Sequence, residues 1–193
     1  MTFTYDITRT RSWTVDDYHR MIDAAILSSD DKVELLEGQI VQMSPQYAPH
    51  AATTHWASDN FRELLKNRAT VRVQLPITLP PRSEPEPDIA IVVGNPRSYI
   101  DRHPMPADIF LLIEVADSTL ESDRNQKATI YAQAGIREYW ILDVNARQVY
   151  VHRQPDGAIY QQVNLRSDRS SSISSLAFPE ISIPLSLLFP FED

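Results

Sequence analysis

The segment IFLLIEVADSTLESDRNQKATIYAQAGIREYWILD, from Ile109 to Asp143, decides the fold of this chain. It begins with a nearly continuous apolar run, Ile109 to Val115, which is typical of a strand covered on both faces. A helix is predicted from about Ser122 to Ala134, closed by Gly135 in the C-terminal cap position. EYWILD, Glu138 to Asp143, is the next predicted strand. This order predicts the α/β class, a mixed β-sheet flanked by helices.

The residues before this segment predict two helices and four strands. Thr14 to Ile26 is predicted as a helix that Thr14 caps, because a threonine hydroxyl accepts from the free amides of the first turn. A longer helix is predicted from Pro49, which suits a first helical turn, to Asn67, with Trp56, Phe61, Leu64 and Leu65 buried. The predicted strands are two within Val33 to Met43, around the turn residues Glu37 and Gly38, and one each at Val71 to Ile77 and Ile89 to Val93.

The residues after the segment predict a hairpin and an apolar tail. Gln148 to Val163 is the expected hairpin, with Pro155, Asp156 and Gly157 in its turn. FPEISIPLSLLF, Phe178 to Phe189, is expected to dock on the core as its last layer, and a role in an interface between chains stays open.

Length and composition favour one compact domain over residues 1–193, since 42% of the residues are hydrophobic. The absence of Cys excludes disulfides and thiol chemistry. We expect a soluble, cytoplasmic protein, because no apolar run approaches the roughly 20 residues of a membrane span and the N-terminus has no signal-peptide core. The net charge of −8 counts against a broad basic surface for nucleic acid, but it allows a local basic face beside an acidic metal site.

Two carboxylates stand at unusual positions. Asp88 lies at the mouth of the apolar strand in EPEPDIAIV, Glu84 to Val92, and Glu114 lies inside the most apolar segment. If their strands are antiparallel neighbours, the two acids lie a few ångströms apart and repel unless a cation lies between them. Oxygen ligands without Cys favour Mg²⁺, or Mn²⁺ in its place. The alternatives are a loop-end acid at Asp88 and a single structural acid at Glu114.

Lys127 shares one helical stripe with Ile130, Tyr131 and Ala134. The stripe is otherwise apolar, so it is expected to pack on the sheet and to point Lys127 toward the strand of Glu114. There a lysine can pair with carboxylates, hold a phosphate oxygen or orient a water. The alternative is an ordinary surface salt pair with Asp123, four residues earlier.

Asp88, Glu114 and Lys127 together resemble the pattern of the PD-(D/E)-x-K nuclease superfamily. More closely, the chain is similar to the bacterial Uma-type restriction endonuclease family. The segments that carry this resemblance are VELLEGQIVQMSP, PEPDIAIV, LLIEVADSTLESDRNQKATIYAQAGIREYWILD and VYVHR, within roughly Trp13 to Phe189. The long third segment is the most specific. The resemblance implies a restriction-endonuclease-like core.

By this resemblance, Asp88 and Glu114 are the metal ligands and Lys127 is the active-site lysine. The usual superfamily position of the lysine, two residues after the second acid, holds Ala116 here. Lys127, on the predicted helix, matches a variant of the family pattern in which the lysine lies on this helix instead of the strand. The main-chain carbonyl of Val115 is a further metal ligand by superfamily analogy.

Three other positions match the family pattern, and they are Glu34, His50 and Asp123. Glu34 matches an upstream acid that completes the metal shell, and His50 matches a histidine at the start of the long helix, with binding to solvent or backbone as its alternative. Asp123 matches a family acid, and a salt-pair role is favoured over a catalytic one. His55 is expected to lie on the helix surface.

The resemblance implies an Mg²⁺-dependent endonuclease that hydrolyses DNA phosphodiester bonds. Two alternatives stay open: a catalytically silent nuclease-fold module that binds nucleic acid or a protein partner, and a metal-dependent hydrolase of RNA or nucleotides, which a small closed pocket would favour. A homodimer would supply the two sites that cutting both strands needs. The basic residues that could hold DNA, or form a solvated surface, are Arg62, Lys66, Arg68, Arg72, Arg97, Arg102 and His103.

Overall fold

The computed structural model describes residues 11–28, 30–168 and 170–190. Its centre is a six-stranded sheet in the order β3-β4-β5-β6-β7-β8. β5 and β6 are parallel, and the other neighbouring strands are antiparallel. The predicted mixed sheet of the α/β class is therefore confirmed. Its strands are β3 (Thr70–Val73), β4 (Ile89–Val92), β5 (Ile109–Ala116), β6 (Glu138–Asp143), β7 (Gln148–Asp156) and β8 (Ile159–Arg166).

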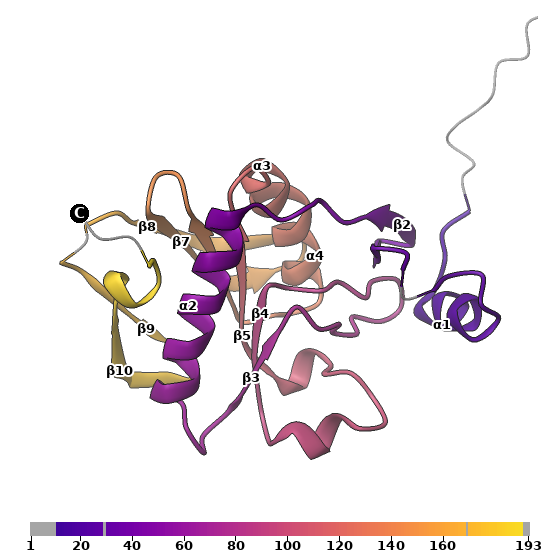
Figure 1. The fold of residues 1–193 in the computed structure, drawn as a ribbon, viewed down its shortest axis with the longest axis horizontal. Coiled ribbons are helices and arrows are strands. Elements are labelled where there is room, and N and C mark those ends of the chain that lie inside the picture. The colour runs from indigo at the N-terminus through magenta and orange to yellow at the C-terminus, as the bar shows by residue number, and fades with distance from the viewer. Residues whose placement is uncertain (1–10, 29, 169, 191–193) are drawn as a thin grey trace, which may run out of the picture.

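Helices cover both faces of this sheet (Figure 1). On one face lie α2 (Ala48–Leu64) and the hairpin of β9 (Ser172–Ser175) and β10 (Phe178–Pro184), which share a core cluster with the sheet. On the other face lies α4 (Ala128–Gln133), whose apolar residues belong to a second cluster. β5 contributes to both clusters, which explains why its sequence is apolar nearly throughout.

The connection from β5 to β6 is a helix with an irregular middle. It begins as α3 (Leu120–Ser122), continues as one π-helical turn over Asp123–Lys127 and ends as α4. Gly135 follows with φ +74°, as predicted for the residue that closes this helix. The predicted span of Ser122 to Ala134 is thus confirmed, and the π turn is a feature that periodicity did not predict.

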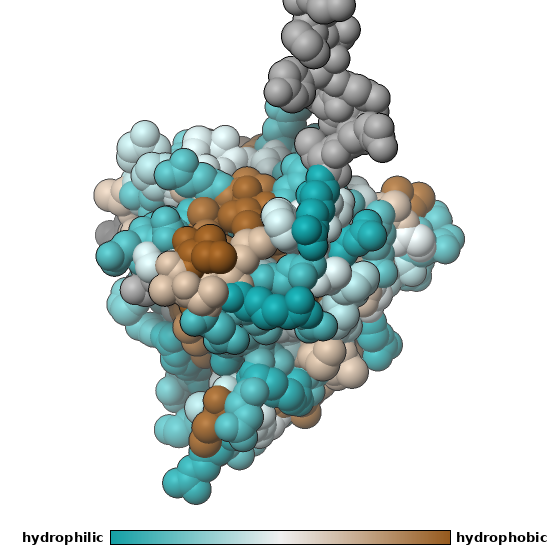
Figure 2. All heavy atoms as spheres, turned by 90° about the vertical axis from the view of Figure 1, so that its right-hand side faces the viewer, coloured by the Kyte–Doolittle hydropathy of each residue, from teal (hydrophilic) through white to brown (hydrophobic). Residues whose placement is uncertain are grey.

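α1 (Val15–Asp23) and the hairpin of β1 (Val33–Leu36) and β2 (Gln39–Gln42) lie beside the main sheet (Figure 1). Thr14 caps α1 as predicted, because its hydroxyl accepts from the Asp17 N–H at 3.1 Å and the Asp17 carboxylate accepts from the Thr14 N–H at 3.2 Å. Figure 2 shows this side of the molecule as mostly hydrophilic, with an apolar patch above its middle and smaller ones at the upper right edge and the lower left.

Four local predictions are wrong in extent, and one of them is the long helix, which ends at Leu64 rather than Asn67. α1 ends at Asp23 rather than Ile26, because Ala25 has φ +54° and leaves the helical conformation. β3 ends at Val73 rather than Ile77, because Gln74 has φ +51° and turns the chain out of the strand. The hairpin turn is Gly157 and Ala158, because Pro155 and Asp156 are paired within β7 and β8.

The predicted buried face of α2 is confirmed at Phe61 and Leu65, which are nearly inaccessible. Leu64 is partly buried. The predicted burial of Trp56 is wrong, since this residue is 43% exposed and its indole N–H donates to the Ser186 carbonyl at 3.3 Å. This tryptophan therefore lies on the edge of the core rather than within it.

The C-terminal segment is a layer of the core, as predicted, and its Leu185, Leu188 and Phe189 are buried. Glu138, which is fully buried, links the β9–β10 hairpin to the main sheet through hydrogen bonds. Its carboxylate accepts two hydrogen bonds from Arg153, at 2.8 and 2.6 Å, and one from the Leu176 N–H at 2.6 Å. Among the described residues, no helix has the length and apolar character that crossing a membrane requires.

Candidate active site

The pairing of β4 with β5 brings Asp88 and Glu114 together. Ile89 lies opposite Ile113 in this antiparallel pair, so Asp88 at the start of β4 lies opposite Glu114 near the end of β5. The Asp88 N–H donates to Glu114 Oε2 at 3.4 Å. Both side chains are buried. The sequence-based prediction that the two acids meet across antiparallel strands is confirmed.

Asp88 accepts hydrogen bonds from three different parts of the chain. The Val115 N–H donates to Oδ2 at 2.9 Å, and the Gln74 side-chain amide donates to Oδ1 at 3.1 Å. His50, in the first turn of α2, has Nε2 3.1 Å from Oδ2. The alternative for His50, binding to solvent or backbone, is therefore wrong.

The His50–Asp88 contact shifts both groups toward their charged forms. Burial raises the pKa of Asp88, but the bonds from His50 and Val115 outweigh it and the net pKa is lowered. Burial lowers the pKa of His50, but Asp88 outweighs it and the net pKa is raised. His55 lies on the helix surface as predicted, with an 81% exposed side chain that pairs with Asp59.

Glu114 accepts two hydrogen bonds on one oxygen. Lys127 Nζ lies 3.0 Å from Oε1, and the Tyr131 hydroxyl donates to the same atom at 2.7 Å. Burial raises the pKa of Glu114 to about 8, against the effect of Lys127, and the charge of Asp88 adds to the rise. Burial lowers the pKa of Lys127, but Glu114 and the other carboxylates raise it above its usual value, so the ammonium is charged.

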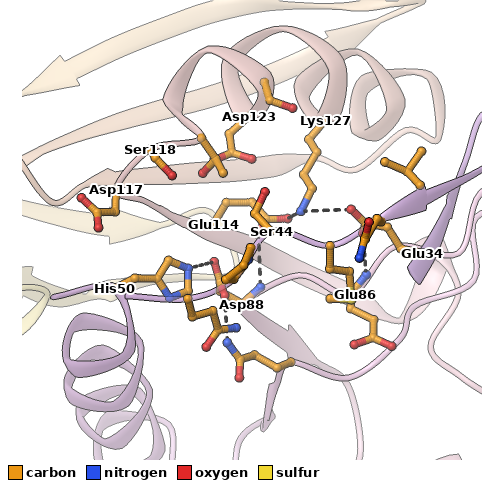
Figure 3. Close-up of a pocket in the computed structure, with 18 of the residues that line it drawn as sticks. Glu34, Ser44, His50, Glu86, Asp88, Glu114, Asp117, Ser118, Asp123 and Lys127 are labelled. Atoms are coloured by element: carbon orange, nitrogen blue, oxygen red, sulfur yellow. Dashed lines mark hydrogen bonds and ion pairs between the residues drawn. The ribbon is translucent and has the colours of Figure 1, made fainter. Parts of the chain in front are cut away.

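Glu34 and Glu86 form the other side of the site (Figure 3). Glu34 Oε1 lies 3.9 Å from Lys127 Nζ, and Glu34 Oε2 accepts from the Glu86 N–H at 3.2 Å. Burial, and then the charge of Glu34, raise the pKa of Glu86. Lys127 therefore lies between Glu114 and Glu34, as Figure 3 shows.

The position of Asp123 contradicts the predicted surface salt pair with Lys127. It is 3% exposed and accepts from the Thr119 hydroxyl at 2.6 Å, and no ion pair joins it to Lys127. The π turn over Asp123–Lys127 is the reason, because its wider turn takes residues four apart out of alignment. Burial raises the pKa of Asp123. The surface salt pair is therefore wrong, and Asp123 is a buried acid that lines the pocket.

These residues line one pocket of about 170 Å³. Its lining includes residues 42–47, from the end of β2 onward, and residues 117–119, after β5. Ser44, Asp117 and Ser118 also face it (Figure 3). The acids of the pocket outnumber its two basic side chains, which are His50 and Lys127; these acids are Glu34, Glu86, Asp88, Glu114, Asp117 and Asp123.

Asp88, Glu114 and the backbone at Val115 form an oxygen-rich set that fits Mg²⁺. The Val115 N–H points at Asp88, and in a strand the C=O of the same residue faces the same side. Among the side chains that the structure describes, no group of three or more His, Cys, Asp or Glu is arranged around a metal position. Two carboxylates and one carbonyl still suit Mg²⁺, which keeps several waters and uses phosphate oxygens.

The sequence did not predict three residues that contribute to the site, which are Gln74, Tyr131 and Glu86. Gln74 depends on a left-handed backbone conformation that no residue pattern announces. Tyr131 was visible only as part of an apolar stripe, although a tyrosine at a buried position usually needs a partner for its hydroxyl. Glu86 lies within the quoted segment EPEPD, and its burial became evident only from the fold.

The basic residues considered for DNA binding are mostly engaged with partners. Arg62 pairs with Asp59 at 2.6 Å, and Arg68 pairs with Glu180. Arg72 donates a hydrogen bond to the Pro76 carbonyl, and Arg102 forms an ion pair with Asp108 at 2.5 Å. Lys66 and Arg97 are exposed. These residues therefore offer a thin basic surface rather than a broad one, in line with the acidic net charge.

Comparison with known proteins adds a family and a fold. A family model described as "Uma2: Putative restriction endonuclease" matches residues 15–186. No curated protein matches the chain. One similar solved structure, a "putative nuclease belonging to DUF820 from Anabaena variabilis ATCC 29413", shares 18% sequence identity at a TM-score of 0.68. That alignment covers 92% of this chain and 97% of that chain, so the two proteins share the fold over nearly their whole length.

Proposed function

This chain belongs to the Uma2 family, and from that premise we propose that it is an endonuclease that hydrolyses DNA phosphodiester bonds with a bound divalent metal ion. The observation that carries the proposal is the convergence of Asp88, Glu114 and Lys127 at one end of the sheet. Keeping two buried carboxylates close together beside a partly buried lysine costs free energy. Lys127 alone does not offset the burial of Glu114, whose pKa stays raised. A cation between the carboxylates would offset it.

Asp88, Glu114 and the Val115 carbonyl would hold Mg²⁺, with Mn²⁺ as a substitute. The metal, when bound, polarises the scissile phosphate and lowers the pKa of a water. Lys127 orients the attacking water and stabilises the negative charge that develops on the phosphate oxygens. Water adds to phosphorus and the bond to the 3′-oxygen breaks, which leaves a 5′-phosphate and a 3′-hydroxyl.

His50 and Glu34 support these groups. His50 holds Asp88 in its ionised form through the 3.1 Å contact. Glu34, 3.9 Å from the Lys127 ammonium, keeps that group charged and limits where it can point.

A small closed pocket would favour a free nucleotide if it could enclose one, but this pocket is too small to do so, and its size therefore favours a polymer. Its volume of about 170 Å³ is below the roughly 300–1,000 Å³ typical of sites that enclose a small molecule. It accommodates a phosphate group and its waters rather than a whole nucleotide. A phosphate of a polymer backbone fits a pocket of this size.

Plasmid cleavage by the wild type and by Asp88→Ala tests the proposal, with Mg²⁺, with Mn²⁺ and with EDTA. The expected result is nicking or linearisation that needs metal and is lost in Asp88→Ala. Asp59→Ala is the control, because Asp59 is an exposed acid on α2 outside the pocket and should leave cleavage unchanged.

A folded wild type that cuts no DNA with either metal would contradict the proposal. Calorimetry with Mn²⁺ then separates the alternatives. Metal binding without DNA cleavage would indicate another phosphodiester substrate such as RNA, and no metal binding would indicate a silent binding module.

A further inference from the structure

Tyr131 has an unusual position among the buried residues of the helix that carries Lys127. It is 0% exposed, and its hydroxyl donates to Glu114 Oε1 at 2.7 Å. Lys127, one turn earlier on the same face of that helix, has Nζ 3.0 Å from the same oxygen. One oxygen of Glu114 thus accepts two hydrogen bonds, one from the charged Lys127 ammonium and one from the neutral Tyr131 hydroxyl.

The ring of Tyr131 is held in place independently of this bond. It packs edge-on against Tyr139, with ring centroids 4.9 Å apart and planes at 73°. Its neighbours Ile130 and Ala132 are also buried. The hydroxyl is therefore aimed at Glu114 by the packing of the ring, and it does not depend on Lys127 for its direction.

The second oxygen of Glu114 is left for another partner. Oε2 has a long contact of 3.4 Å from the Asp88 N–H, which places it on the side of Asp88 and Val115. Because Oε1 accepts two hydrogen bonds, Oε2 is the oxygen of Glu114 that would remain for a metal ion. A rotation of the carboxylate would break the 2.7 Å bond from Tyr131.

We propose that Tyr131 is a positioning residue that fixes the Glu114 carboxylate for the metal and thereby lets Lys127 leave it to act on the substrate. This inference rests on the proposed function. If Lys127 were the only donor to Oε1, its movement toward a phosphate or a water would free the carboxylate to turn. Tyr131 holds Oε1 while Lys127 moves, so Oε2 stays directed at the metal.

Tyr131→Phe, with Tyr160→Phe as the matched control, tests this role. Tyr160 is also a buried tyrosine whose ring lies near Tyr139, but its hydroxyl donates to the Ile136 carbonyl at 2.9 Å, outside the pocket. Each substitution removes one hydroxyl and one buried hydrogen bond. The measurements are the melting temperature without metal, calorimetric titration with Mn²⁺ without DNA, and steady-state cleavage of plasmid DNA.

Both variants are expected to lose a similar few degrees in melting temperature. Only Tyr131→Phe should weaken Mn²⁺ binding, by about tenfold or more, as for other residues that orient metal ligands. It should lower kcat with little change in KM, because Tyr131 is buried and does not reach the DNA.

Equal Mn²⁺ affinity and equal cleavage in the two variants would overturn the inference, since Tyr131 would then only stabilise the fold. A Tyr131→Phe protein that fails to fold, while Tyr160→Phe folds, would overturn it as well. A folded wild type that binds no Mn²⁺ would instead contradict the proposed function, so the two failures can be told apart.

Discussion

Lys127 and Glu114 lie 13 residues apart in the chain and form a partly buried ion pair at 3.0 Å. Two elements create this contact: β5 carries Glu114, and the helix that follows returns over the sheet and carries Lys127. The strand position two residues after Glu114 is Ala116, which is fully buried in the same core cluster as Tyr131. Ala116 shares this cluster with Ala128 and Tyr131 of the helix, and the lysine of the site comes from the helix instead.

Replacing Lys127 with Ala should abolish plasmid cleavage while the protein still folds. The variant loses the group that orients water and stabilises charge, a contribution of about 10²–10⁴-fold for groups that act on the reacting atoms. The fold survives because Glu114, whose pKa is already about 8, can take up a proton when its partner is gone. Cleavage assays and circular dichroism check both parts. The exposed Lys32→Ala, whose side chain does not line the pocket, is the control, and undiminished cleavage by Lys127→Ala would remove the role assigned to Lys127.

Two histidines on α2 provide a matched pair of substitutions. His50→Ala removes the contact at 3.1 Å to Asp88, whereas His55→Ala removes an exposed side chain five residues later. Hydrogen bonds to charged groups contribute about 1.5–3 kcal/mol, so His50→Ala should lower the free energy of unfolding and reduce cleavage about 10–100-fold through misplacement of Asp88. His55→Ala should change neither. Urea unfolding and plasmid cleavage measure the two effects, and equal behaviour of the two variants would contradict the prediction.

The centre of the site could be predicted because it depends on local patterns. An acid at the start of one apolar strand and an acid within the next strand meet when the strands are antiparallel, and the register of Ile89 with Ile113 fulfils that condition. Lys127 followed from helical periodicity, which the α-helical turn from Lys127 to Tyr131 preserves. The resemblance to the family pointed to the same three residues and added Glu34 and His50.

The rest of the site depends on backbone geometry that a residue pattern does not carry. The π turn at Asp123–Lys127 removed the predicted salt pair, because the residues four apart no longer share a face. Gln74 reaches Asp88 only because its φ of +51° ends β3 early. Both features are irregular, and irregular backbone is common where a site is built.

His152 should make the stability of the fold depend on pH. It is 4% exposed on β7, with its ring 5.2 Å from Tyr139 and 5.6 Å from Tyr160, and its buried Nδ1 has no hydrogen-bond partner among the described residues. Burial lowers the pKa of His152 below its usual 6.5, and the charge of Arg124 adds to the decrease. The unfolded chain therefore binds a proton at a pH where the folded chain does not.

The free energy of unfolding should accordingly fall as the pH decreases below about 6.5, by at most about 1.4 kcal/mol per pH unit for this one group, and level off once the folded His152 is protonated too. Urea unfolding of the wild type and of His152→Phe at pH 7.5 and 5.5 checks this, because phenylalanine keeps the aromatic packing and cannot titrate. The wild type should lose more stability than the variant between these two pH values. His50, whose pKa is raised, acts in the opposite direction in both proteins, so only the difference between them reports His152. Equal losses in the two proteins would show that His152 is not the group that responds.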